Sequence, residues 1–364
     1  MTQEDEIRKI EEEIRKTPYN KATQGHIGRL KAKLAKLKFD QEKVAKGGPK
    51  GMGYAIKKSG DATVILVGFP SVGKSTLLNR LTNAESRIGE YDFTTLNVIP
   101  GMLDYNETKI QILDIPGLVE GAASGKGRGK EILSVVRAAD LVLIMADVKN
   151  PEQVEIIKKE FYNAGFRLNQ KKPDIRIEKT NTGGIQIGST VKLKKISHDE
   201  IKSILREFKI LNADVLIRED ITADWFIDCV IGNRIYIPAL VVLNKIDTGQ
   251  PLSLKSIQKH WGDENIVAIS AKNGTGIEEL KKILWQKLNL IRIYMKKTGR
   301  EPDLKEPFVF RKGVTVKDVC HRIHKKMVED LKFARIWGPS SKFPGQKVGL
   351  NHILKDRDII ELHK

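Results

Sequence analysis

The feature that most constrains this 364-residue chain is the run GFPSVGKS at residues 68–75. It matches the phosphate-loop pattern GxxxxGK[ST], which requires a buried strand before it and a helix after it. The apolar run at residues 63–67 predicts the strand, and residues 76–81 predict the helix. In that setting, glycines let backbone N–H groups wrap phosphate oxygens, and the helix amino end adds positive potential. The sequence therefore predicts a nucleotide site at this loop.

Each residue of this loop has a predicted part in binding. Lys74 reaches the β- and γ-phosphates and is a predicted catalytic residue, while the Ser75 hydroxyl ligates Mg²⁺. The other predicted nucleotide contacts of the loop are Gly68, Phe69, Pro70, Ser71, Val72, Gly73 and Thr76.

A DIPG motif at residues 114–117 follows a predicted strand at residues 109–113. The Asp114 carboxylate is predicted to hold magnesium through its water shell, because Mg²⁺ prefers to keep several waters. The Gly117 N–H is placed to sense the γ-phosphate, and Gly117 is a second predicted catalytic residue. The nucleotide contacts predicted from this motif are Asp114, Ile115, Pro116 and Gly117.

The run DFTTL at residues 92–96 lies between the phosphate loop and the DIPG motif. A mobile threonine at this place can close on magnesium only when a γ-phosphate is present, which is an order–disorder switch. Thr95 is the predicted metal ligand and catalytic residue, and Thr94 is the alternative. Phe93 and Thr94 are also predicted nucleotide contacts.

Two motifs at later strand ends select the base. NKID at residues 244–247 follows a predicted strand, and SAK at residues 270–272 follows the next one. An Asp carboxylate accepts both the ring N–H and the exocyclic amine of guanine, whereas adenine offers no such donor pair. The SAK segment supplies a backbone N–H to the guanine oxygen, so we predict a guanine site, and an ATPase is the competing hypothesis. The predicted base contacts are Asn244, Lys245, Asp247, Ser270, Ala271 and Lys272.

From residue 62 the chain alternates buried strands with amphipathic helices, which predicts an α/β fold with a mostly parallel sheet and helices on both faces. Because the carboxyl ends of parallel strands share one edge, the motifs are predicted to meet there. A helix is predicted at residues 277–290. The strands are predicted at residues 63–67, 109–113, 141–146, 239–243 and 266–269.

The segments before and inside this sheet have different patterns. Helical stripes of isoleucine and leucine before residue 38 predict an amino-terminal helical hairpin, which is either autonomous or an arm packed on its neighbour. Ser197 and Thr222 are predicted to cap two helices of a small inserted α+β domain. Its strands are predicted at residues 175–177, 185–187 and 214–217.

The glycine-punctuated tail after residue 290 predicts a compact β-rich module. Its elements are predicted as strands at residues 307–310, 335–337 and 358–362, with a helix at 316–327. The predicted domains are residues 1–60, a basic helical region with a linker; 61–164 and 236–290, the α/β domain; 165–235, the insert; and 291–364, the tail module.

The formal net charge of +18 is concentrated at the two ends of the chain: +7 over residues 1–60, +1 over 61–286 and +10 over 287–364. Such ends favour a polyanionic partner, in particular nucleic acid, through counterion release; the alternative is a lysine-rich soluble surface. No run of eighteen apolar residues occurs, so we expect no membrane-spanning helix and no membrane partner. Two cysteines and an amino end without an apolar signal core fit a cytoplasmic protein.

Together these motifs resemble those of TRAFAC-class G domains, and more closely the Obg-like group, which is similar at YDFTTL (residues 91–96), DIPGL (114–118) and GAASGKGRG (121–129). The whole chain resembles the developmentally regulated GTP-binding protein family, called DRG. The resemblance implies a P-loop NTPase G domain of Obg type with an inserted α+β domain, an amino-terminal helical hairpin and a carboxyl-terminal β-grasp-like TGS domain. It also implies an archaeal member or a close eukaryotic relative.

In that family the proteins are cytoplasmic GTPases associated with translation and helped by a regulatory protein partner. The resemblance therefore implies GTP/GDP and Mg²⁺ as ligands, a ribosome or RNA as partner, and a DRG-family regulatory protein. We expect a monomer. The basic loop at residues 122–130 is predicted to be a nucleotide-sensitive second switch, against the alternative of a flexible surface loop. Lys342 and Lys347 are candidate RNA contacts.

Leu118 occupies the position after DIPG where many small GTPases have a water-orienting glutamine. Because leucine cannot hydrogen-bond water, we predict slow intrinsic hydrolysis that a partner residue, the ribosome or a monovalent cation stimulates. K⁺ activation in related proteins uses an asparagine in the phosphate loop, where this chain has Ser71. The second hypothesis is an RNA- or ribosome-binding module in which GTP is a structural ligand.

Overall fold

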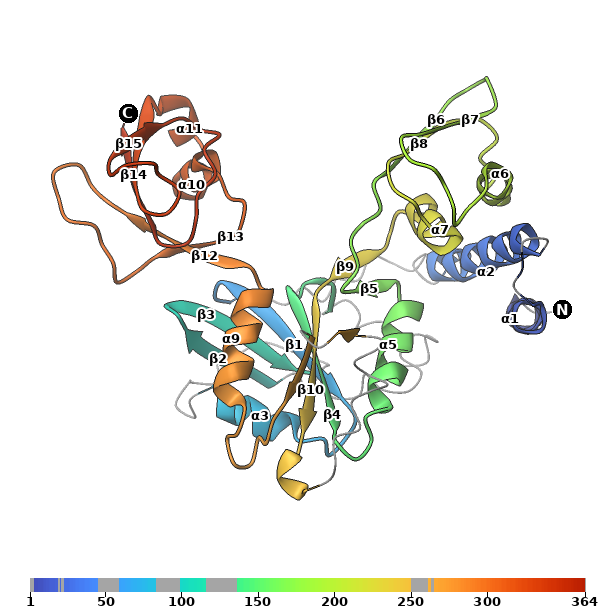
Figure 1. Ribbon diagram of the computed structural model, residues 1–364, viewed down its shortest axis with the longest axis horizontal. Coiled ribbons are helices and arrows are strands. Elements are labelled where there is room, and N and C mark those ends of the chain that lie inside the picture. Colours follow the sequence, from blue (N-terminus) through green and yellow to red (C-terminus); the bar gives the residue numbers. More distant parts are fainter. Residues whose placement is uncertain are drawn as a thin grey trace. The chain divides into compact units, whose positions relative to one another are not determined.

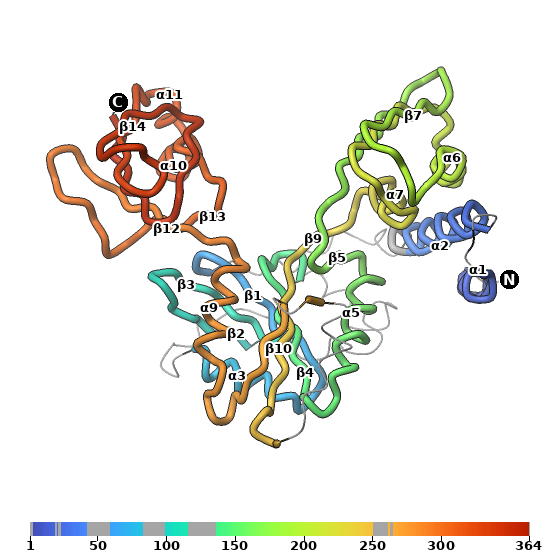
Figure 2. Tube along the Cα trace, viewed as in Figure 1, coloured from blue at the N-terminus to red at the C-terminus, as the bar shows by residue number. Residues whose placement is uncertain are grey.

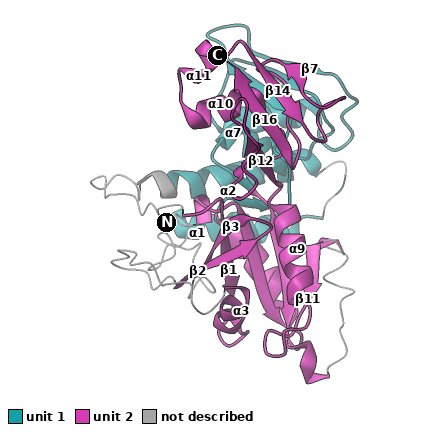
Figure 3. Cartoon of the chain, turned by 90° about the vertical axis from the view of Figure 1, so that its left-hand side faces the viewer, with its two compact units in different colours: residues 1–53, 165–236 teal, residues 54–164, 237–364 magenta. Residues whose placement is uncertain are grey.

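The computed structural model describes residues 3–18, 20, 23–44, 59–82, 99–115, 136–249, 261–262 and 265–363. The chain, traced in Figure 2, divides into two compact units, which Figure 3 shows in different colours. Unit 1 combines residues 1–53 with 165–236, and unit 2 combines residues 54–164 with 237–364. The amino-terminal helices therefore share a unit with the inserted segment, although the phosphate-loop segment separates them in sequence.

Unit 2 contains a six-stranded sheet with the strand order β11-β10-β4-β1-β3-β2 (Figure 1). All neighbouring strands are parallel except β2, which runs antiparallel to β3. This confirms the predicted mostly parallel sheet. The strands are β1 (Ala62–Gly68), β2 (Ile99–Tyr105), β3 (Thr108–Asp114), β4 (Leu141–Asp147), β10 (Ala239–Asn244) and β11 (Ile266–Ala268).

The central strands of this sheet are apolar along their whole length because helices cover both faces. β1 and β4 are buried at every position. The helices α3 (Lys74–Leu81) and α9 (Ile277–Lys287) lie on one side of the sheet, and α5 (Gln153–Asn163) lies on the other (Figure 1). The parallel strands end in loops along one edge of the sheet, and these loops carry the predicted motifs.

Five strands of the structure are absent from the sequence-based prediction, and two of them adjoin this sheet and its helices. No strand is predicted at β2; it lies at the edge of the sheet, the position where a strand that contains a proline, here Pro100, is tolerated. β12 (Leu290–Met295) begins where the predicted helix at residues 277–290 ends. That helix end is wrong: α9 stops at Lys287, and Asn289, with a φ of 52°, turns the chain into the strand.

The insert in unit 1 contains a three-stranded sheet with the order β6-β8-β7 and two helices. Both predicted caps are confirmed: the Ser197 side chain accepts from the Glu200 N–H, and the Thr222 side chain accepts from the Trp225 N–H. The elements of the insert are β5 (Phe166–Leu168), β6 (Ile175–Lys179), β7 (Ile185–Ser189), α6 (His198–Glu207), β8 (Ala213–Ile217), α7 (Ala223–Ile231) and β9 (Ile235–Ile237), with β5 and β9 paired.

The amino-terminal hairpin consists of α1 (Gln3–Lys16) and α2 (Gln24–Val44), and α2 packs on α6 and α7. Ala32 of α2 is fully buried in the core of the insert. The hairpin is therefore an arm packed on its neighbour within unit 1. α2 is 21 residues long but rich in lysine, and none of the helices in the described ranges is long and apolar enough to cross a membrane.

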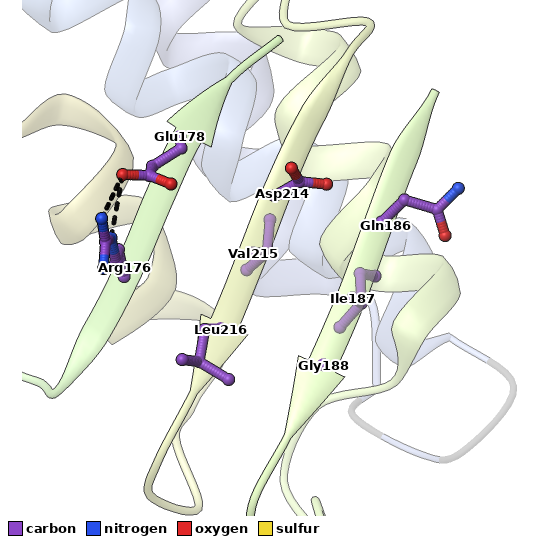
Figure 4. Close-up of a pocket in the computed structure, with 8 residues that line it drawn as sticks. All are labelled: Arg176, Glu178, Gln186, Ile187, Gly188, Asp214, Val215 and Leu216. Atoms are coloured by element: carbon purple, nitrogen blue, oxygen red, sulfur yellow. Dashed lines mark hydrogen bonds and ion pairs between the residues drawn. The ribbon is translucent and has the colours of Figure 1, made fainter. Parts of the chain in front are cut away.

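One face of the β6-β8-β7 sheet lies away from the helices and is polar (Figure 4). Arg176 donates to Glu178 at 2.6 Å on β6, and Asp214 of β8 is the cross-strand neighbour of Glu178. Leu216 and Gly188 line a shallow hollow beside them. The residues that line this hollow include one cation and two carboxylates, so this face has no surplus of positive charge.

The carboxyl-terminal part of unit 2 contains a five-stranded sheet with the order β13-β12-β16-β14-β15. The helix α10 (Val316–Ile323) packs on one of its faces. The helix predicted at residues 316–327 is wrong in its length, because His324 is extended, with φ −164° and ψ 137°, and α11 (Met327–Asp330) is a separate turn. The other strands are β13 (Phe308–Arg311), β14 (Phe333–Trp337), β15 (Gln346–Val348) and β16 (Asp358–His363).

Candidate functional site

The loop after β1 lies tightly against the neighbouring strand ends. A Cβ atom on Gly68 would lie 2.4 Å from the Met145 carbonyl oxygen, and one on Gly73 would lie 2.5 Å from Asn244 Nδ2. Gly73 also has a φ of 97°, a conformation that residues with a side chain rarely adopt. Glycine at these two positions therefore lets the loop stay compact and turn directly into α3.

Lys74 folds back over this loop. Its Nζ donates to the carbonyl oxygens of Gly68 and Phe69, each at 3.1 Å. No carboxylate within the described ranges lies at ion-pair distance from the Lys74 ammonium group. Because neutral carbonyl oxygens leave its charge uncompensated, the loop is prepared to bind an anion such as a phosphate.

Ser75 and Asp114 meet beside the loop. The Ser75 Oγ donates to Asp114 Oδ2 at 3.3 Å. Asp114 is only 3% exposed, and its Oδ1 has no hydrogen-bond partner among the residues that the structure describes. Burial raises the pKa of Asp114 above its usual range, although Lys74 and the Ser75 hydroxyl act in the opposite direction. A buried carboxylate oxygen without a partner, next to a hydroxyl, fits a hydrated divalent cation.

Asn244 joins the phosphate loop to the segment at residues 270–272. Its Nδ2 donates to the Val72 carbonyl oxygen at 2.9 Å, and its Oδ1 accepts from the Ala271 N–H at 2.9 Å. The side chain is buried, so both hydrogen bonds are protected from competition with water. Asn244 therefore holds together the two loops that are predicted to bind the phosphates and the base.

Asp247 is exposed but held in position by Ser270. The Ser270 Oγ donates to Asp247 Oδ1 at 2.6 Å. This hydrogen bond is the main reason why the pKa of Asp247 lies below its usual range. The carboxylate is therefore ionised at neutral pH and oriented, which is the state that can accept two N–H donors from guanine.

Models of three protein families match consecutive parts of the chain. One described as the 50S ribosome-binding GTPase matches residues 63–180, one described as the C-terminal region of the MMR_HSR1 domain matches residues 182–290, and the TGS domain matches residues 291–364. The human developmentally-regulated GTP-binding protein 2 is 44% identical over 362 residues, which cover 99% of this chain and 99% of the human one. This chain belongs to the DRG family.

Archaeal relatives also match this DRG-family chain over nearly its whole length. An uncharacterized GTP-binding protein of Methanocaldococcus jannaschii is 54% identical over 361 residues, covering 99% of this chain and 92% of its own. Among solved structures, the G domain of the Thermotoga maritima FeoB iron transporter aligns with 62% of this chain and 98% of its own, at 20% identity and a TM-score of 0.36. The predicted family, with its P-loop G domain and TGS domain, is confirmed.

Two side chains at the site of this DRG-family protein, Asp147 and Arg80, are missing from the sequence-based prediction. The Lys245 Nζ lies 2.8 Å from Oδ2 of Asp147, at the end of β4. Burial alone would raise the pKa of Asp147, but the Lys149 N–H and the Lys245 ammonium group together lower it. Arg80 of α3 donates to the Ala271 and Lys272 carbonyl oxygens, at 3.2 and 2.7 Å.

A sequence signal exists for only one of these two residues. A carboxylate directly after an apolar strand, as at Asp147, marks a strand end at the binding edge. Nothing in the sequence singles out Arg80, because its partners are backbone oxygens far along the chain.

The structure brings most of the predicted site residues to one edge of the sheet. The phosphate-loop residues, Asp114 and Ile115 lie at the ends of β1 and β3, and the NKID and SAK residues follow β10 and β11. The remaining predicted contacts, together with Leu118 and the loop at residues 122–130, lie outside the described residues. Those contacts are Phe93, Thr94, Thr95, Pro116 and Gly117.

Proposed function

We propose that this DRG-family protein binds GTP and hydrolyses it to GDP and phosphate, as a slow molecular switch associated with ribosomes or other RNA-bearing assemblies. The observation that carries the proposal is the double hydrogen bond of Asn244, which joins the phosphate loop to the loop beside Asp247. A nucleotide has phosphates at one end and a base at the other, so it needs a phosphate-binding and a base-binding loop held side by side, as these two are.

In the proposed complex, Lys74 exchanges its two carbonyl partners for phosphate oxygens, which are charged and therefore form stronger hydrogen bonds. Asp247 accepts the two N–H donors of guanine. The Ala271 N–H already donates to Asn244, so we assign the donor for the guanine oxygen to the Lys272 N–H. Asp147 positions the Lys245 side chain along the base, and Arg80 positions the carbonyl oxygens of the SAK loop.

The donor set at Ser75 and Asp114 fits Mg²⁺. Ser75 would ligate the ion directly, Asp114 would hold it through water, and Thr95 would join them when GTP is bound. When bound, Mg²⁺ supplies charge neutralisation at the β- and γ-phosphates. The raised pKa of Asp114 means that acidic conditions protonate this carboxylate earlier than an ordinary one, which weakens a cation site as pH falls.

For hydrolysis, the residues of this chain contribute positioning and electrostatic stabilisation rather than a general base. Lys74 holds the phosphates, and Gly117 and Thr95 are the proposed contacts of the transferred group. Leu118 cannot orient a water molecule, so turnover is slow until a partner residue, the ribosome or a monovalent cation such as K⁺ stabilises the developing charge.

The proposal is tested by multiple-turnover GTP hydrolysis with the purified full chain, with and without ribosomes, in K⁺ and in Na⁺. We expect slow turnover alone and at least tenfold stimulation by ribosomes or K⁺, on the scale of one missing transition-state contact. Lys74→Ala should abolish turnover, and circular dichroism should show that this variant is folded.

Leu118 also supports a second candidate, an RNA- or ribosome-binding module in which GTP is a structural ligand. If the protein binds GTP but neither ribosomes nor K⁺ stimulate hydrolysis, the structural-ligand function replaces the GTPase switch. Equal competition by ATP would contradict the guanine site itself.

A further inference from the structure

The TGS-domain sheet carries a row of charged side chains on the face opposite to α10. Lys347 of β15 is the cross-strand neighbour of Arg335 on β14, and Arg335 is the neighbour of Glu361 on β16. Lys296, directly after β12, pairs with Glu361 at 3.5 Å. The row therefore crosses four strands, and it contains three cations and one carboxylate. We call this surface, formed by Lys347, Arg335, Glu361 and Lys296, the outer basic row.

Aromatic rings hold two of these cations in place. The Lys347 Nζ lies 4.5 Å from the centre of the Phe333 ring, and the Lys296 Nζ lies 4.2 Å from the Trp337 ring. His363 stacks on Phe333 with the ring centres 4.5 Å apart. Because the ammonium groups already rest on these rings, less side-chain freedom is lost when they bind an anion.

Two of the three cations of this row are available to a ligand. Arg335 and Lys347 are exposed, and neither has a carboxylate partner among the described residues. Glu361, the one carboxylate of the row, is only 4% exposed and is already paired with Lys296. Further along β12, Arg292 and Tyr294 are buried against Asn106 and Glu107, so the open part of this face ends at the row.

The helix α10 covers the other face of the sheet, where Val316, Val319 and Cys320 pack against Ile336 and Ile360. Arg335 and Ile336 are consecutive residues of β14, and consecutive strand residues point to opposite faces. The basic row is therefore not covered by this helix.

We propose that the outer basic row binds single-stranded RNA by its phosphates; this inference rests on the RNA association in the proposed function. Four neighbouring strands about 4.8 Å apart make the row about 14 Å long, enough for consecutive phosphates of an extended strand. The half-buried rings of Phe333, His363 and Trp337 flank the row, where the bases of such a strand would lie. The deep, narrow major groove of an RNA duplex does not admit a five-stranded sheet, so a single strand is the better fit.

The test is fluorescence anisotropy of a labelled 20-nucleotide single-stranded RNA titrated with the full chain across a KCl series. The variant Arg335→Gln with Lys347→Gln removes two row charges. The matched control is Lys325→Gln with Lys326→Gln, which removes two exposed charges between α10 and α11, outside the sheet. We expect the row variant to make the slope of log K against log salt shallower by about 1.4, since each phosphate contact on a single strand contributes about 0.7.

The control should leave the slope unchanged. Equal losses in both variants, or no loss in the row variant, would overturn the proposal. So would equally potent competition by poly-glutamate or phosphatidylserine vesicles, because either would show a general anion surface, and so would tighter binding of the same RNA as a duplex. GTP turnover measured on the same samples separates the two claims: a chain that hydrolyses GTP but fails these tests leaves the GTPase proposal standing.

Discussion

The two basic ends of this chain use their cations differently. In unit 1, the lysines of α2 up to residue 41 are satisfied internally: Lys31, Lys33 and Lys38 each lie 2.7 Å from a carboxylate oxygen, of Asp224, Glu6 and Glu11. Lys36 donates to the Glu207 carbonyl oxygen at 2.6 Å. In the TGS domain, Arg335 and Lys347 lie on an open sheet face without such partners in the described part of the chain.

The comparison shows that net charge in a sequence overstates the charge that a ligand meets. Counterion release from a nucleic acid requires cations that can move onto phosphates, and a lysine already paired with a carboxylate gains little by doing so. The open sheet face of the insert gives the same contrast, because its Arg176 is paired with Glu178 beside Asp214 (Figure 4). Among the residues that the structure describes, those of the carboxyl-terminal end are therefore the better candidates for the polyanion surface.

The largest expected effect is a loss of stability on breaking the buried ion pairs of unit 1. Asp228 accepts from Arg167 at 2.5 and 2.6 Å and from Arg234 at 2.9 Å, and it is 4% exposed. Asp228→Ala leaves two arginines without their carboxylate, and we expect a loss of about 3–5 kcal/mol. Hydrogen exchange of the β6 and β8 peptides measures this loss in the full chain.

The matched control is Asp174→Ala, which removes an exposed pair with Arg218 and should cost less than about 1 kcal/mol. Similar losses for the two variants would mean that burial does not distinguish the two pairs. That result would contradict the account of unit 1 as a module held by internal charge pairing.

A smaller effect is expected where α2 crosses the insert. A Cβ atom on Gly28 would lie 2.4 Å from Oε1 of the buried Glu200, whereas one on Gly25 would meet nothing within 4 Å. We expect Gly28→Ala to be about 1–3 kcal/mol less stable than Gly25→Ala, since only the Cβ atom at position 28 is overpacked. Urea unfolding followed by circular dichroism compares them; equal stabilities would show that α2 is not docked through this contact.

The smallest effect is expected for the lysines of α2. Lys33→Gln with Lys38→Gln removes two cations that Glu6 and Glu11 already neutralise, so RNA affinity should change by less than about twofold. Stability should change by no more than about 1 kcal/mol for each exposed pair. Anisotropy at the salt concentrations used for the TGS-domain variants checks this, and a loss as large as theirs would abolish the contrast between the two ends.

The predictions that the structure confirms rest on local signals. In each cap, of Ser197 and of Thr222, a side-chain oxygen accepts from the N–H three residues later. Both partners lie in one short stretch of sequence, so the cap can be predicted without the fold. β1, β3, β4, β10 and β11 lie where short apolar runs predict them. The predictions that failed are boundaries: α9 ends at Lys287 and α10 at Ile323, because a turn there depends on the following strand or loop rather than on helix periodicity.

The order and spacing of the motifs predicted, without any structure, a guanine-nucleotide site at the edge of a mostly parallel sheet, because phosphate and base recognition need particular residues at strand ends. The DRG family and the TGS domain were inferred from the resemblance of the sequence. Only the tertiary structure decided that α2 contributes to the core of the insert, that Asp147 and Arg80 contact the segments predicted to bind the base, and which of the described cations lack a carboxylate partner. The physical reason is that ion pairing, burial and docking depend on which distant segments come into contact. The sequence of a charged residue or an apolar stripe does not specify the segment that it contacts.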